Sequence, residues 1–219
     1  SHTPTLIVYK NVYNVINLAE HDQTGQEFLP KYYSNIFFNH DFRRALPSEH
    51  RRAISVRDEQ QHRKIFQIHL NTVKAMHQAG VKLHLGSDST LGSTSVPGAA
   101  MHKEIEYFMD AGIGLEETLK IATVGAGKSL GLTGLGRIET GAPADLLIFR
   151  EDPTTNWNNA DNLVAVVASG RLYDRTLLKN YLLEYKEFHD QPIFSSVIPA
   201  LLYLLADIKS LIDAATSPQ

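Results

Sequence analysis

The sequence predicts an α/β fold, and this prediction rests on three observations. Apolar residues recur at three- and four-residue spacing over 58–79, as on one face of a helix, and Gly80 follows where a left-handed C-cap residue belongs. Residues 81–88 then alternate between apolar and polar or small side chains, as in a strand. A helix that passes through glycine directly into a strand is the αβ half of an α/β unit.

Composition limits the class of protein. The chain has 219 residues, no cysteine, a formal net charge of -3 and 43% hydrophobic residues. This hydrophobic share is that of a globular protein and argues against wholesale disorder. The slight acidity argues against nucleic-acid binding, because no basic face supplies phosphate contacts. Disulfides, thiolate nucleophiles and cysteine zinc sites are excluded. The longest apolar run, 197–206, is too short to span a membrane.

The N-terminal third is predicted to hold one strand and two helices. Residues 5–9 follow Pro4 and are nearly all apolar and partly β-branched, which predicts a short buried strand. A polar, aromatic-rich stretch follows, in which we expect a helix over 27–39. The helix over 58–79 has the clearest pattern in the chain, with Asp58 as its N-cap.

The remaining elements follow in order and are separated by glycine. They are helices over 100–111 and 115–130, a glycine-rich connector over 134–143, a strand over 144–149, a second strand over 163–169 that turns at Gly170 and continues to Tyr173, and a helical tail over 175–215 interrupted near Pro192.

One motif imitates a phosphate-binding P-loop. Residues 125–129 read Gly-Ala-Gly-Lys-Ser, but the P-loop also requires a glycine at position 122, which is Ala here. It further requires a strand before the motif and a helix that starts at Lys-Ser, whereas this motif lies at the end of a predicted helix. The sequence therefore argues against nucleotide binding at this place.

Asp88 is the candidate catalytic and metal-binding residue. It ends the predicted strand on its polar face and precedes a Ser/Gly/Pro loop over 89–98. In barrel-type α/β folds, residues at the C-terminal ends of strands line the active site, where a carboxylate can bind a metal or transfer a proton. Asp also caps turns before Ser and Thr, and the spacing by itself leaves both interpretations open.

Other polar residues are weaker candidates. His84 and Lys82 share the face of Asp88, and we expect both to be buried and hydrogen-bonded. His102, at the start of the next helix, could contact a substrate at the mouth of the site, or could simply be solvated. Because His102 and Glu104 are two residues apart, they do not share a helix face, and a joint metal site is not expected.

The order of further motifs resembles the amidohydrolase superfamily. Residues 80–89 resemble its eighth barrel strand, which ends in Gly-Thr-Asp or Gly-Ser-Asp, and residues 4–6 resemble its seventh. The resemblance is closest to the prolidase- and imidazolonepropionase-like branch. It continues in order through Pro97-Gly98, His102–Glu106, Ala111-Gly112, Leu119–Thr123, Leu130–Leu132, Gly136–Gly141, Ala144–Phe149 and Val166–Asp174.

The resemblance implies three parts. They are the C-terminal part of a (β/α)8 TIM-like barrel with its last two strands and helices (1–133), part of a small β-sandwich (134–174) and a helical C-terminal extension (175–219). A barrel alone takes about 250 residues, and two strands cannot close one. We therefore expect a fragment of a longer enzyme, which also fits the absence of an initial Met. The first residues contain no signal-peptide pattern, so the sequence assigns no compartment.

The resemblance also implies a metal-dependent hydrolase of C–N bonds in amides, dipeptides or cyclic amides. Such enzymes use one or two divalent ions, often zinc, to activate water. Asp88 would bind metal and transfer the proton of the water to the leaving amine. The family's first-strand His-x-His is absent from this sequence, and one carboxylate cannot hold a catalytic zinc, which needs three protein ligands.

The expected partners follow from these implications. They are a small amide or peptide substrate and the N-terminal portion of the same enzyme. An apolar stripe over 198–212 predicts packing either against the barrel, as a core-covering helix, or against a second copy of the chain. Neither nucleic acid nor a membrane is expected. The alternative is a non-catalytic fold remnant that acts as a binding or interaction module.

Overall fold

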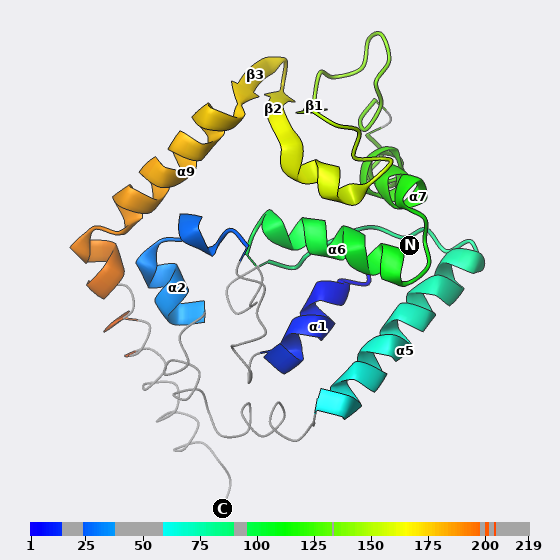
Figure 1. Cartoon of the computed structure of the whole chain (residues 1–219), viewed down its shortest axis with the longest axis horizontal. Coiled ribbons are helices and arrows are strands. Elements are labelled where there is room, and N and C mark those ends of the chain that lie inside the picture. The colour runs from blue at the N-terminus through cyan, green and yellow to red at the C-terminus, as the bar shows by residue number, and fades with distance from the viewer. Residues whose placement is uncertain are drawn as a thin grey trace, which may run out of the picture.

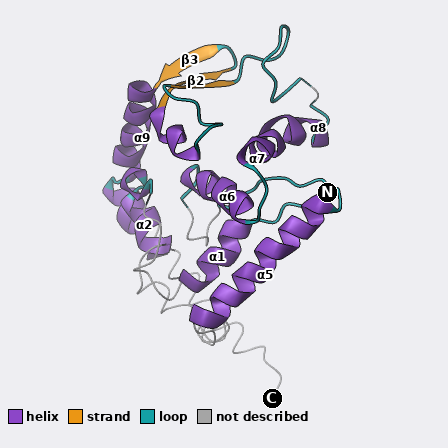
Figure 2. Cartoon of the chain, turned by 45° about the vertical axis from the view of Figure 1, so that its right-hand side comes forward, coloured by secondary structure: helices purple, strands orange, loops and turns teal. Residues whose placement is uncertain are grey.

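The computed structural model describes residues 1–14, 24–37, 59–89, 96–132, 134–197, 200–201 and 204 (Figure 1). Helices α1, α5 and α6 lie together, the sheet lies on the other side of α6, and α9 runs from the sheet toward α2 (Figures 1 and 2). In chain order the elements are α1 (Leu6–Asn14), η2 (Gln26–Phe28), α2 (Lys31–Phe37), α5 (Glu59–Gln78), α6 (Ala99–Asp110), α7 (Leu115–Lys120), η3 (Ile121–Gly125), α8 (Ala126–Ser129), β1 (Leu146–Phe149), η4 (Trp157–Asn162), β2 (Leu163–Ala168), β3 (Arg171–Asp174), α9 (Arg175–His189) and η5 (Ile193–Val197).

The helices predicted from apolar spacing are confirmed. The predicted helix over 58–79 is α5, and Gly80 has a φ of 75°, as a left-handed C-cap requires. The next two predictions correspond to α6 and to the run from α7 to α8. The expected helix over 27–39 is found in part, as η2 and α2, and its end lies outside the described residues. Asp58, the predicted N-cap of α5, also lies outside the described residues.

Segment 81–88, which was predicted as a strand, pairs at a single residue. Leu83 forms a parallel bridge with His2. The N–H of His2 donates to the carbonyl of Lys82 at 2.9 Å, and the N–H of His84 donates to the carbonyl of His2 at 3.0 Å. Two chain segments 81 residues apart thus run parallel, as neighbouring strands of an α/β unit do. That this part of the chain is the C-terminal part of a (β/α)8 barrel stays a prediction.

The predicted strand over 5–9 is wrong, and so is the assignment of residues 4–6 to a barrel strand, because helix α1 begins here. The amide N–H groups of Leu6 and Ile7 donate to the carboxylate of Glu104 at 2.9 and 2.8 Å. The first amides of a helix have no partner within the helix, and a carboxylate satisfies them. This contact between distant residues outweighs the local β preference of the apolar run.

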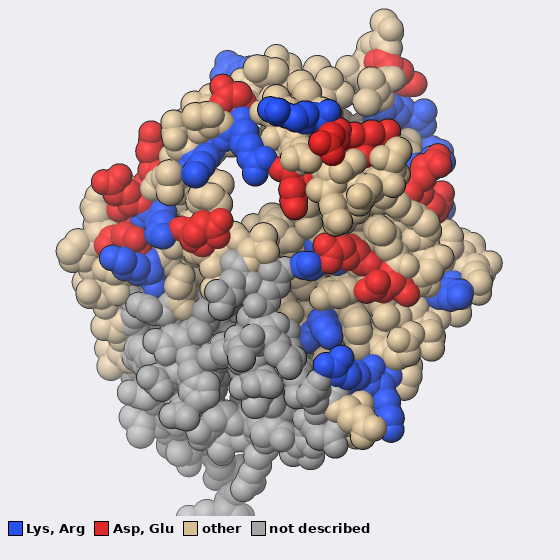
Figure 3. Space-filling view, in the orientation of Figure 1, with Lys and Arg blue, Asp and Glu red and all other residues tan. Residues whose placement is uncertain are grey.

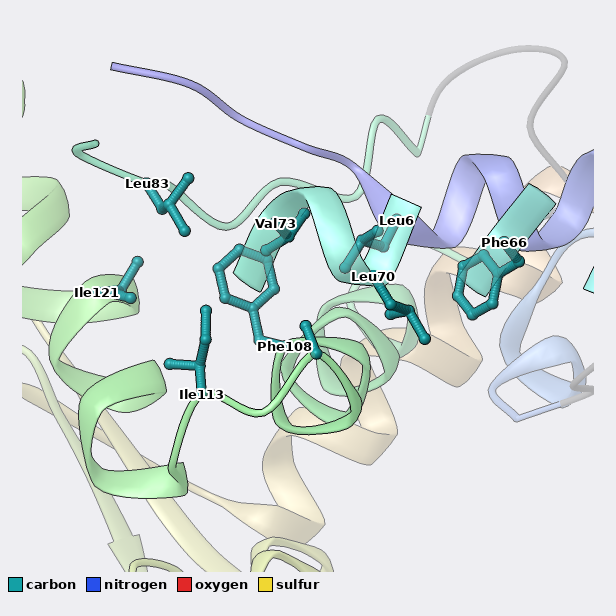
Figure 4. Close-up of a cluster of buried hydrophobic side chains, with 9 residues drawn as sticks. Leu6, Phe66, Leu70, Val73, Leu83, Phe108, Ile113 and Ile121 are labelled. Carbon is teal, nitrogen blue, oxygen red and sulfur yellow. The ribbon is translucent and has the colours of Figure 1, made fainter. Parts of the chain in front are cut away.

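The hydrophobic core lies among α1, α5, α6, the start of α7–α8 and segment 81–88 (Figure 4). The ring of Phe108, which is 0% exposed, extends from α6 toward Val73 of α5 and Ile113 (Figure 4). The other buried members of this cluster are Leu6, Phe66, Leu70, Leu83, Ala111 and Ile121.

Helix α7, the π turn η3 and α8 form one continuous helical run. The P-loop imitation, 125–129, lies inside this run and no strand precedes it, which confirms that it is not a P-loop. The turn over 134–136 lies very close to the run. A Cβ built on Gly136 would lie 2.4 Å from the carbonyl carbon of Thr123, and one on Gly127 would lie 2.9 Å from the carbonyl oxygen of Leu135.

The three strands form one antiparallel sheet in the order β1-β2-β3. Leu147 pairs with Val166, which pairs on its other side with Tyr173. The predicted strands over 144–149 and 163–173 are therefore confirmed. A β-sandwich, and the division of the chain at residues 133 and 174, stay predictions.

The tail begins with α9, whose N-cap is Asp174. The carboxylate of Asp174 accepts a hydrogen bond from the N–H of Leu177 at 2.8 Å. Helix α9 ends at His189 and η5 begins at Ile193, which confirms a helical tail with a break near Pro192. Most of the apolar stripe over 198–212 lies outside the described residues. Among the helices that are described, none is long and apolar enough to cross a bilayer.

Candidate functional site

Asp88 ends segment 81–88 with its side chain exposed. Its φ of 45° is left-handed, a conformation that Asp and Asn adopt more readily than other residues with a side chain. Its carboxylate forms no hydrogen bond or ion pair with the residues described here, while the neighbouring hydroxyls of Ser87 and Ser89 bond to each other at 3.0 Å. The loop amides after Ser89 that a side-chain turn cap would bind lie outside the described residues, so the turn-cap and the catalytic interpretations of Asp88 both stay predictions.

Gly86, two residues before Asp88, lies against Thr3 of the parallel segment. A Cβ at position 86 would lie 2.7 Å from the Cγ2 of Thr3. Real Cβ atoms do not reach this distance. Glycine thus lets residues 1–3 lie against the segment that carries Asp88.

We expect Gly86→Ala to lower the free energy of unfolding by about 1–3 kcal/mol, because the new methyl group forces Thr3 away from the segment. Urea denaturation followed by circular dichroism measures the loss. The matched rescue is Thr3→Ser in the Gly86→Ala background, since serine keeps the hydroxyl but lacks Cγ2. If Thr3→Ser restores none of the lost stability, the collision is not the cause.

Lys82 and His84 depart from the expectation that both are buried and hydrogen-bonded. Lys82 is exposed, His84 is half-buried, and neither side chain forms a hydrogen bond with a described residue. Lys82 instead lines an open hollow of about 330 Å³, together with His77 of α5 and Lys128 of α8. Because this hollow is open to solvent, the ammonium group of Lys82 stays hydrated and needs no partner.

His102 lies in the first turn of α6 and is exposed. Its ring centroid lies 5.3 Å from that of Trp157 in η4, with 39° between the ring planes. The two rings line a hollow of about 340 Å³ between α6, η4 and Thr24. Asp88 is not among its lining residues, so the described structure does not bring the two predicted site residues into one cavity. The other lining residues are Ala99, Lys103, Glu106, Asn158 and Asp161.

Glu104 lies on the opposite face of α6 from His102, as the two-residue spacing predicted, and is 0% exposed. Burial raises the pKa of Glu104 to about 7, although the hydrogen bonds from the amides of Ile7 and Leu6 lower it. From the sequence, Glu104 was a candidate only as a partner of His102, and its burial was not predicted. The apolar spacing of Ala100, Ile105 and Phe108 places Glu104 on the buried face and was the available signal.

The described residues do not by themselves fit a metal centre. Among the residues that the structure places, no group of three or more His, Cys, Asp or Glu side chains is arranged to hold an ion. A catalytic zinc needs three protein ligands, and Asp88 supplies one carboxylate. We therefore derive no reaction step through a metal from this structure.

Acidic and basic side chains are interspersed on the face shown in Figure 3. Neither sign gathers there into a wide patch of the kind that binds a phosphate backbone. The absence of a nucleic-acid partner stays a prediction.

Comparison with known proteins gives one family. Residues 34–173 match the model of the amidohydrolase family. This match covers most of the chain and includes Asp88, His102, the strands β1 and β2, and β3 up to Tyr173. No protein of curated function matches the chain.

Several solved structures are similar over part of their length. An amidohydrolase is 24% identical with a TM-score of 0.47, and the match covers 67% of this chain and 33% of that chain. A prolidase complexed with N-methylphosphonate-L-proline is 22% identical with a TM-score of 0.47, covering 67% and 34%. A putative prolidase from Bifidobacterium longum is 21% identical with a TM-score of 0.45, covering 65% and 36%. The chain thus spans about a third of the length of these structures.

Proposed function

The chain belongs to the amidohydrolase family, and we propose that it is the Asp88-bearing part of an enzyme that hydrolyses C–N bonds in amides, dipeptides or cyclic amides. The observation that carries the proposal is the family match over 34–173, which includes the one exposed carboxylate that ends segment 81–88. A carboxylate without a partner in the described chain can accept a proton from water or bind a cation, which a capped carboxylate does less well.

We further propose that the other ligands of a divalent metal centre, with zinc as the first candidate, come from a portion of the enzyme N-terminal to this chain. Two observations support this proposal: the described residues supply too few ligands for zinc, and the chain spans about a third of the structures it resembles. Residues 1–133 would then be completed into a barrel, and the open hydrogen-bonding edge of segment 81–88 would be paired.

His102 and Trp157 are proposed as the substrate-contacting surface. Two aromatic rings that lie next to each other, tilted by 39°, beside a hollow of about 340 Å³ offer apolar contact to a planar amide or ring, and the Lys103–Glu106 ion pair at 2.8 Å gives the hollow a polar wall. The proposed partners are a small amide or peptide, the N-terminal portion and a second copy of the chain.

Two preparations test the function: the 219-residue chain and the full-length product of its gene. The chain alone is expected to contain no stoichiometric zinc by mass spectrometry and to hydrolyse neither dipeptides, N-acyl amino acids nor cyclic amides. The full-length product is expected to contain stoichiometric zinc and to hydrolyse at least one of these substrate classes. Robust turnover by the chain alone would show that it needs no further portion, and an inactive, metal-free full-length product would favour the binding module instead.

In the full-length product, Asp88→Asn is expected to lower kcat by about 10²–10⁴-fold, because the amide can no longer take a proton. The matched control is Asp110→Asn, which changes another exposed carboxylate, at the end of α6. Steady-state kinetics of both variants decide the role. An Asp88→Asn enzyme with the kcat of the Asp110→Asn enzyme would remove Asp88 from the catalytic machinery.

A further inference from the structure

Glu104 is a buried carboxyl group that joins two distant parts of the chain. It is 0% exposed on α6, and its two oxygens accept hydrogen bonds from the amides of Leu6 and Ile7, at 2.9 and 2.8 Å, across 98 and 97 residues of sequence. Leu6 is 1% exposed and Ile7 is 4% exposed, so the contact is closed to solvent on the side of α1 as well.

Within the described residues, no cation pairs with this carboxyl group. Among the described helices, α1, α5 and α7 pack with α6. The causes that shift the Glu104 pKa there are its burial and the two backbone amides, with no charged side chain among them. From α1 and α5, Lys10 lies over Phe66 and Tyr9 stacks on His69. Helix α5 also carries His62, which is buried, and Lys74, which is exposed. Helix α7 carries the ion pair Glu116–Lys120, and α6 itself carries His102 and the ion pair Lys103–Glu106.

We propose that Glu104 is a proton-dependent latch, whose protonation favours and whose ionisation disfavours the docking of residues 1–7 against α6. The physical reason is the balance of solvation. A docked carboxylate loses its water and receives only two amide hydrogen bonds in return, whereas a neutral carboxyl group loses much less on burial. Undocking of α1 returns the carboxylate to water.

The sign of the pH effect follows from linkage. The docked pKa is about 7 and the value for a solvated Glu is 4.5, so the docked state binds the proton more tightly. Docking is therefore strongest below pH 4.5 and weakens as the pH rises to about 7, beyond which it levels off. Between pH 5 and pH 8, these two pKa values predict that the docking constant falls by about 70-fold.

The latch acts on the segment that ends at Asp88. Residues 1–3 lie between the latch and that segment, because His2 bridges Leu83 and Thr3 lies against Gly86. Loss of docking thus removes the parallel partner of segment 81–88 and the support next to Asp88. This inference concerns the fold and does not depend on whether the protein hydrolyses amides.

Two measurements on the unmodified chain test the latch. Carbon-detected NMR of the Glu104 side-chain carboxyl is expected to give a titration midpoint near 7. Hydrogen exchange of the Leu6 to Val8 amides, divided by the rate of an unstructured peptide of the same sequence at each pH, is expected to show about 70-fold less protection at pH 8 than at pH 5. A midpoint below 5, or protection that is flat with pH, would overturn the proposal.

Substitution separates Glu104 from other groups. In Glu104→Gln the side chain stays neutral and does not titrate, so protection of residues 6–8 is expected to be constant from pH 5 to pH 8. The control, Glu106→Gln on the exposed side of the same helix, should keep the wild-type pH dependence. Persistent pH dependence in Glu104→Gln, or an equal change at the core amide of Leu70, would overturn a local latch. If Glu104→Gln does not fold, the NMR titration and the hydrogen exchange of the unmodified chain still test whether Glu104 controls docking.

Discussion

Phe108→Ala is expected to lower the free energy of unfolding by about 3–5 kcal/mol. Phe108 is 0% exposed and lies at the centre of the cluster that joins α1, α5 and α6, so its removal leaves a cavity that surrounding helices cannot fill. Because whole domains are stable by only about 5–15 kcal/mol, this loss is a large part of the total. Urea denaturation followed by circular dichroism at 222 nm measures the change as a lower midpoint with an unchanged slope.

The control for Phe108 is Phe188→Ala on α9. Phe188 is 54% exposed, and its truncation is expected to cost less than about 1 kcal/mol. Equal losses in the two variants would mean that the cluster around Phe108 is not the core of the chain.

Gly136→Ala is expected to cost about 2–5 kcal/mol. The φ of 73° at this position costs a residue with a Cβ about 1–2 kcal/mol. The added Cβ would also lie 2.4–2.6 Å from backbone atoms of Thr123 and Val124 in η3, and relief of this overlap costs about 1–3 kcal/mol more. The helical backbone cannot rotate away as a side chain could, so the turn over 134–136 must move off the helix. Thermal and urea unfolding of the variant measure the loss.

The control for Gly136 is Gly131→Ala, which separates backbone conformation from collision. Gly131 has a φ of 74°, and a Cβ there would have nothing within 4 Å. Its substitution is therefore expected to cost only the conformational part, about 1–2 kcal/mol. If the two alanine variants lose the same stability, the close approach between the turn and η3 contributes nothing.

Much of the helical structure could be predicted from the sequence because it depends on local pattern. Helix α5 has its apolar residues on one face and a glycine after its last turn, and both signals lie within the helix itself. The hairpin of β2 and β3 likewise follows from the β-branched run and Gly170. Segment 81–88 was predicted as a full strand, but pairing depends on a partner, and in the described residues only His2 provides one.

The family follows from the sequence alone, through the order of its short motifs. The Gly-Ser-Asp sequence at 86–88 and the motifs after it identified an amidohydrolase, as the family match over 34–173 confirms. The tertiary structure then gave a physical reason for two of the glycines in those motifs, Gly86 and Gly136, since each lies where another segment leaves no room for a Cβ.

The tertiary structure alone decided the conformation of residues 5–9 and the state of Glu104. An apolar, partly β-branched run favours a strand, yet the Glu104 carboxyl binds the first amides of α1 and a helix forms. Local sequence cannot encode this contact, because its two sides lie 98 residues apart and meet only when α1 packs on α6. The packing of α1 on α6 also removes Glu104 from water, and this burial raises its pKa to about 7 although the two amide hydrogen bonds lower it. Sequence pattern thus determined helices such as α5 and α6, whereas long-range packing determined that α1 is helical and that the carboxyl group of Glu104 is buried.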